Sequence, residues 1–150
     1  FSKFFLPDGM IGDSLPKAIG PDLNGSIGSV PGTDSPGAAK YSELAKAAGF
    51  ESGPYGPESY DAAALIMLAM EAAKSTDSNV FKNNVMDIAN APGEKIYPGE
   101  LSKALNLIKE GKDIDYVGAT ALELVGSGES SGSFAEILID NQKTNKVGYR

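Results

Sequence analysis

The most reactive pattern in the sequence is a serine flanked by glycines near the C-terminus. Gly128-Glu129-Ser130-Ser131-Gly132 fits G-x-S-x-G, the sharp turn on which hydrolases carry a nucleophilic serine beside a histidine. The chain has no histidine, and residues 134–140 alternate like a strand where that motif requires a helix. We therefore interpret the pattern as a Gly/Ser hairpin loop and predict no catalytic residue and no enzyme activity.

Two shorter patterns are typical of cofactor or cation sites. Gly126-x-Gly128 has the start of a dinucleotide loop, but no glycine stands at position 131 and no helical pattern follows. Asp113 and Asp115 have a spacing found in calcium loops, but the residues after them do not complete the pattern. Without cysteine or histidine the chain also lacks the usual transition-metal ligands. We expect no cofactor and no metal site.

Two residues remain as candidates for contact with a ligand. Asp8 lies in a Pro-Asp-Gly turn after a predicted strand, where open α/β sheets place their ligand contacts; alternatively, it caps its own backbone. Tyr55 lies in the stiff loop 53–57 before a predicted helix. It can form the wall of a ligand pocket, or it can pack over the loop with its hydroxyl in water.

Composition narrows the classes of partner. The chain has 20 acidic and 13 basic residues and a formal net charge of −7, so it repels phosphate backbones and we expect no nucleic-acid partner. The longest apolar run, 62–73, is interrupted by Glu71 and falls short of the roughly 20 residues of a membrane span. The first residues do not have the pattern of a signal peptide. We expect a soluble protein.

Hydrophobic periodicity and turn residues predict a mixed α/β chain. The helix expected at 58–74, with Ser59 as its cap and Asp61 in its first turn, is apolar on nearly every face, which predicts burial between layers. Too few strands are expected for a complete doubly wound sheet, so the sequence predicts a fragment of a larger α/β protein. The expected helices are 11–19, 38–48, 58–74, 79–89 and 99–110, and the expected strands are 2–6, 25–30, 116–125 and 133–140, the last two joined as a hairpin.

Four stretches of the sequence resemble the C-terminal part of one protein family, and together they cover nearly all of the chain. The third of them combines the aromatic loop 52–55 with a Tyr-Asp-Ala helix start at 60–62. Because the motifs also agree in order and spacing, the chain resembles the leucine/isoleucine/valine-binding proteins, the solute receptors of ABC importers. The other stretches are 5–9, 23–29, and 111–119 with 132–134.

The resemblance implies a three-layer α/β architecture of the type I periplasmic-binding-protein class, here an incomplete piece with segments of two lobes. Residues 1–31 would belong to lobe 2, residues 32–115 mainly to lobe 1, and residues 116–150 would return toward lobe 2. The family's acidic turn maps to Asp8 and Gly9, which would meet the ammonium group of a ligand. The aromatic wall maps to Tyr55 and Pro57, although leucine-binding members carry a large aromatic side chain where Pro57 stands.

The resemblance also implies a function. The chain would belong to a periplasmic receptor that binds an amino acid or a similar small zwitterion by hinge closure and delivers it to an ABC permease. An N-terminal part of the same protein would supply the remaining ligand contacts. The alternative is the ligand-sensing domain of a receptor or of an amide-responsive regulator with the same fold.

Overall fold

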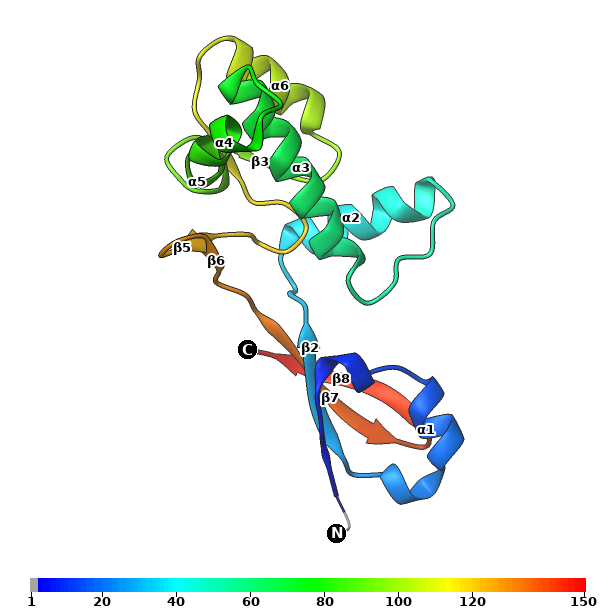
Figure 1. The fold of residues 1–150 in the computed structure, drawn as a ribbon. Helices are drawn as coiled ribbons and strands as arrows, with labels where there is room; N and C mark the ends of the chain where they lie inside the picture. Colours follow the sequence, from blue (N-terminus) through cyan, green and yellow to red (C-terminus); the bar gives the residue numbers. More distant parts are fainter. Residues whose placement is uncertain (1–2) are drawn as a thin grey trace. The chain divides into compact units, whose positions relative to one another are not determined.

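The computed structural model describes residues 3–150, and these residues divide into two compact units (Figure 1). Among the described residues the first unit combines 3–33 with Ser133–Arg150, and the second is Asp34–Gly132. Residue 2, the first of the predicted strand 2–6, lies outside the described residues. The assignment of these segments to two lobes remains a prediction.

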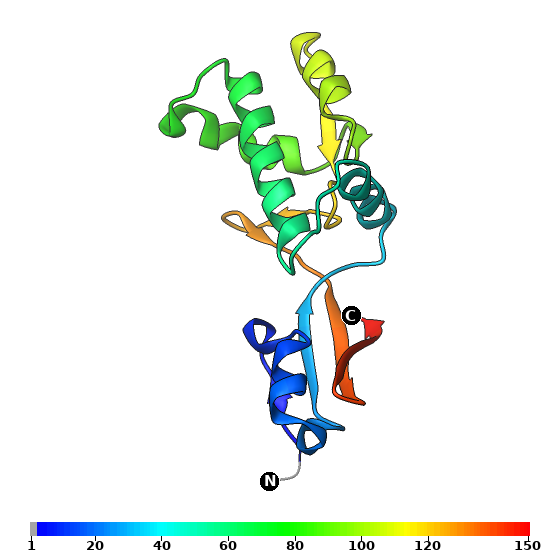
Figure 2. The same ribbon diagram turned by 90° about the vertical axis from the view of Figure 1, so that its right-hand side faces the viewer.

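The first unit is a mixed sheet of four strands in the order β1-β2-β7-β8. Strand β1 (Phe5–Leu6) pairs in parallel with β2 (Ile27–Pro31), while β7 (Phe134–Asp140) pairs antiparallel with β2 and with β8 (Lys143–Tyr149). Between β1 and β2 the chain forms the short helices η1 (Asp8–Met10), α1 (Ser14–Ile19) and η2 (Pro21–Leu23). Figure 2 shows these helices on one side of the sheet.

Strict alternation along β7 fixes which face of the sheet is buried. Ala135, Ile137 and Ile139 point into a core shared with Leu6 and Leu23, as expected for a strand with one covered face. The strand predicted at 133–140 is therefore confirmed as β7. Its predicted partner is wrong, because β7 pairs with β2 and β8 and not with residues 116–125.

The second unit is mainly helical. The helix α2 (Pro36–Ala47) begins where Ser35 accepts a hydrogen bond from the amide of Ala38 and ends before Gly49, which has a positive φ. It is followed by α3 (Gly56–Ala73), α4 (Ser78–Phe81), η3 (Lys82–Asn84), α5 (Val85–Ala89) and α6 (Leu101–Lys109). A parallel pair of strands, β3 (Glu94–Ile96) and β4 (Ile114–Tyr116), packs against them.

The core of the second unit lies between α3 and the β3–β4 pair. Its buried side chains come from α3, α5, α6 and both strands, and they are Ala64, Leu65, Leu68, Ile88, Ala89, Ile96, Ala104, Ile114 and Tyr116. Helix α3 is buried on one face only, since Ile66 is 44% exposed and Met67 is 52% exposed. The prediction that this helix is buried on all sides is therefore wrong for the described residues.

Two further predictions, the helix at 79–89 and the strand at 116–125, are wrong. In each segment side-chain hydrogen bonds replace the backbone hydrogen bonds that would continue the element. The helix expected at 79–89 breaks into α4, η3 and α5, and the Asn83 amide donates to the carbonyls of Asn79 and Val80 at the break. The strand expected at 116–125 ends at Tyr116, and a short hairpin follows, formed by β5 (Leu124–Val125) and β6 (Glu129–Ser130).

Substitution at Ile139 tests the core of the first unit. Ile139 is fully buried on β7, so Ile139→Ala should lower the free energy of unfolding by about 2–4 kcal/mol through lost burial and a cavity. The matched control is Val147→Ala on the neighbouring strand β8, where the side chain is 59% exposed and the expected cost is below about 0.5 kcal/mol. Urea unfolding measures both, and equal losses would contradict the assigned core.

Candidate functional site

A buried carboxylate holds the start of α3 in place. Asp61 is only 2% exposed, and its Oδ1 accepts hydrogen bonds from the Tyr116 hydroxyl (2.9 Å) and the Ala119 amide (2.8 Å). Its Oδ2 accepts from the amide (2.8 Å) and the hydroxyl (2.7 Å) of Thr120. These four donors satisfy a charge that would otherwise be costly to bury.

The Asp61 contacts explain why the chain turns after β4. With their amides bound to Asp61, Ala119 and Thr120 cannot extend the β3–β4 ladder, and Gly118 takes a positive φ of 61° beside the carboxylate. A Cβ at Gly118 would lie 2.4 Å from Asp61 Oδ1, so a side chain there would clash. Position 61 is the sixth residue of α3; the predicted first-turn role of Asp61 and the predicted Ser59 cap are both wrong.

The same loop also sets the position of α2. A Cβ at Gly37, in the first turn of α2, would lie 1.9 Å from the carbonyl oxygen of Gly118. Only a glycine permits this approach of two backbones. The beginnings of α2 and α3 are therefore both fixed on the segment that follows β4.

Tyr55 lies at the tip of a turn directly before α3. The amide of Gly56 donates to the carbonyl of Gly53 over 3.1 Å, and Tyr55 has φ −111° and ψ 19°. With Pro54 in its second position and Gly56 in its fourth, this arrangement is close to a type I turn. The turn presents the Tyr55 side chain, which is 43% exposed.

An apolar pocket lies beside this turn, entirely within the second unit. It has a volume of about 660 Å³ and opens to solvent. Four aromatic residues contribute to its wall, and none of its lining residues carries a charge. The lining residues are Tyr41, Leu44, Ala45, Ala48, Phe50, Gly53, Pro54, Tyr55, Gly56, Ser59 and Tyr60. Tyr55 was singled out from the sequence, whereas Tyr41, Phe50 and Tyr60 were not.

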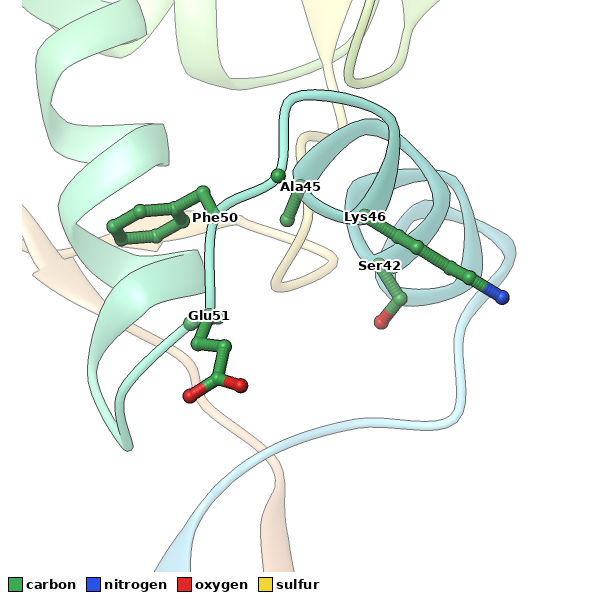
Figure 3. Close-up of a pocket in the computed structure, with 7 residues that line it drawn as sticks. Ser42, Ala45, Lys46, Phe50 and Glu51 are labelled. Atoms are coloured by element: carbon green, nitrogen blue, oxygen red, sulfur yellow. The ribbon is translucent and has the colours of Figure 1, made fainter.

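A second hollow adjoins the apolar pocket and shares Ala45 and Phe50 with it. Its walls include Ser42 and Lys46 of α2 and Phe50 and Glu51 of the loop (Figure 3). Phe50 contributes to both hollows, and its ring is 58% exposed. The charged residues of this region thus line the second hollow and are kept out of the apolar pocket.

The other predicted contacts lie partly outside this pocket. Pro57 belongs to the first turn of α3 and is not among the residues that line the pocket. Asp8 and Gly9 are exposed in η1 of the first unit, directly after β1, and Asp8 Oδ1 accepts the Gly9 amide at 2.7 Å. Asp8 thus contacts its own turn through the adjacent amide, and η1 has no side-chain cap. That Asp8 and Tyr55 face one ligand remains a prediction.

The patterns first considered for catalysis or cation binding have structural roles. Ser130 lies in the β5–β6 hairpin, and Ser131 donates both its amide and its hydroxyl to the Glu123 carbonyl. Asp115 is part of β4, paired with Lys95 of β3. Within residues 3–150, no cluster of three or more acidic side chains could hold a metal ion. No helix in this part of the chain is long and apolar enough to cross a membrane.

Comparison with known proteins identifies the fold. No family model and no curated protein matches the sequence. The crystal structure of a leucine-binding protein, LivK of Thermotoga maritima, is similar with a TM-score of 0.66 and 16% sequence identity. The match covers 98% of this chain and 37% of that protein. The chain therefore has a mixed α/β fold similar to part of this binding protein, and it spans a little over a third of the length of this structural relative.

Removing the Asp61 carboxylate tests its structural role. Asp61→Ala should lower the free energy of unfolding by about 3 kcal/mol or more, because it leaves several buried donors without an acceptor. Asp87→Ala is the matched control, since Asp87 is an exposed aspartate on α5 of the same unit, and it should cost below about 0.5 kcal/mol. A small and equal loss in both variants, measured by chemical unfolding, would contradict this role.

The buried hydroxyl of Tyr116 should make the protein less stable at alkaline pH. Burial, reinforced by the neighbouring Asp61 carboxylate, raises the pKa of the Tyr116 hydroxyl well above its ordinary value. Above pH of about 10 the unfolded chain loses this proton while the folded chain keeps it, so stability falls as pH rises. Between pH 10.5 and 11.5 the free energy of unfolding of the wild type should fall by roughly 1.2 kcal/mol more than that of Tyr116→Phe. If the free energy of unfolding fell equally with pH in the two proteins, the raised pKa of Tyr116 would be contradicted.

Proposed function

We propose that this chain is part of an extracytoplasmic solute-binding protein that binds an amino acid or a similar small zwitterion. The observation that carries the proposal is the likeness of almost the whole chain to part of a leucine-binding protein. The apolar pocket beside Tyr55 supports it, because ligand sites are concave and mostly apolar with a few polar groups. The proposal assigns no chemical step to the chain, which would bind its ligand and release it unchanged.

Asp8 would bind the ammonium group of the ligand. Its side chain is exposed immediately beyond the carboxyl end of β1, the sheet edge at which α/β proteins bind ligands. A carboxylate can accept about four hydrogen bonds, and the Gly9 amide uses one acceptor site on Oδ1. A charge-assisted contact to an ammonium group is therefore compatible with the turn, and Gly9 allows close approach of the backbone.

Tyr55 would contact the remainder of the ligand. Its turn is held by the Gly53–Gly56 hydrogen bond, so the ring is presented with little conformational freedom to lose on binding. The uncharged lining of the apolar pocket favours an uncharged ligand side chain, because a buried charge without a partner is costly. Pro57 would act indirectly, by starting α3 immediately after Tyr55.

The proposal extends to the whole protein. A second set of contacts, to the ligand carboxylate, would come from an N-terminal part of the same protein, and two lobes would close over the ligand about a hinge. The partner that receives the ligand would be an ABC permease, and the location would be the periplasm.

Titration calorimetry of the full-length protein against a panel of amino acids tests this function. We expect at least one amino acid to bind, and Asp8→Ala to weaken its binding at least tenfold, through loss of a charge-assisted hydrogen bond of about 1.5–3 kcal/mol. Asp22→Ala, which removes another exposed aspartate of the same unit, should leave the affinity unchanged. If no amino acid binds, the solute-binding function is refuted. An affinity unaffected by Asp8→Ala would refute the ammonium contact alone.

A further inference from the structure

We propose that Tyr41 is a positioning residue whose buried hydroxyl, acting through Ser52, fixes the turn that presents Tyr55 and thereby sets the affinity for the ligand. This inference rests on the proposed function, since it concerns the same pocket. Tyr41 lies on α2 and Tyr55 directly before α3, and both side chains line the apolar pocket.

A chain of hydrogen bonds connects Tyr41 to the turn. The hydroxyls of Tyr41 and Ser52 are 3.0 Å apart, and Ser52 donates its own proton to the Gly53 carbonyl at 3.2 Å. The Tyr41 hydroxyl is therefore the donor to Ser52 Oγ. The Gly53 carbonyl also accepts the Gly56 amide that closes the turn. The Gly53 carbonyl oxygen thus accepts two hydrogen bonds. One, from the Gly56 amide, closes the turn around Tyr55, and the other, from Ser52, connects the turn to Tyr41 on α2.

The Tyr41 ring is itself immobilised. Tyr41 is only 7% exposed, and its ring meets that of Tyr60 on α3 edge to face, with centroids 5.5 Å apart. Such pairs add about 0.5–1.5 kcal/mol beyond the area that they bury. The hydroxyl therefore projects from a side chain already held between α2 and α3, which makes it a fixed anchor for the exposed loop.

Close packing at Gly56 shows how little space surrounds this contact. A Cβ at position 56 would lie 2.1 Å from Ser52 Oγ and 2.7 Å from the Tyr41 hydroxyl oxygen. The last residue of the turn thus sits directly against the Tyr41–Ser52 hydrogen bond. Movement of Ser52 away from Tyr41 would release the segment that carries Tyr55, while the buried core of the unit would remain packed.

The test compares ligand affinities of the full-length protein, using whichever amino acid of the panel the wild type binds most tightly. Tyr41→Phe removes only the hydroxyl and keeps the ring contact with Tyr60. We expect it to weaken binding about three- to tenfold, as for the loss of one hydrogen bond. Ser52→Ala breaks the same connection and should give a similar loss. Tyr97→Phe removes the hydroxyl of a tyrosine that does not line the pocket, and the affinity should stay within twofold of the wild type.

A double-mutant cycle separates positioning from general destabilisation. In a Tyr55→Ala background, Tyr41→Phe should have no further effect on affinity, because the side chain that it positions is gone. An unchanged affinity in Tyr41→Phe, or a loss that persists in full without Tyr55, would overturn the inference while leaving the solute-binding function intact. If the wild type binds no amino acid of the panel, the solute-binding function fails, and this inference fails with it.

Discussion

The second unit depends on one interaction, the burial of the Asp61 carboxylate among four hydrogen-bond donors. Three of these donors belong to the loop that follows β4 and the fourth is the Tyr116 hydroxyl at the end of that strand. The carboxylate therefore joins α3 to the strand pair in a fixed register. Because Gly37 packs on the backbone of Gly118 in the same loop, α2 is placed by the same interaction.

This constraint has a consequence for binding. The pocket beside Tyr55 is formed by α2, by the beginning of α3 and by the loop between them, so the Asp61 contacts also help to position its walls. A preformed wall avoids the entropic cost of ordering a loop on binding. Asp61 thus holds the beginning of α3 in place, and the turn immediately before this helix exposes Tyr55 at the pocket.

The sequence was sufficient to predict elements that depend on hydrophobic periodicity alone. It was not sufficient where a side chain far away in the sequence determines where an element ends. Alternation was sufficient to find β7, and the fold class followed from motifs in a consistent order. The end of β4 could not be predicted, because it depends on Asp61, which lies 58 residues before Ala119. Strand β8 was missed because its sequence is polar, although Asn141, at a φ of 51°, signals the tight turn before it. Tyr55 was singled out from its stiff loop, whereas Tyr41 was not, since its hydrogen bond to Ser52 crosses that loop.

The central proposal is that the turn before α3 presents Tyr55 to a small zwitterionic ligand. A crystal structure of the full-length protein with its tightest-binding amino acid tests this most directly. The proposed function predicts that the Tyr55 ring lies in van der Waals contact with the side chain of the bound amino acid. A ligand bound with Tyr55 out of contact would contradict it.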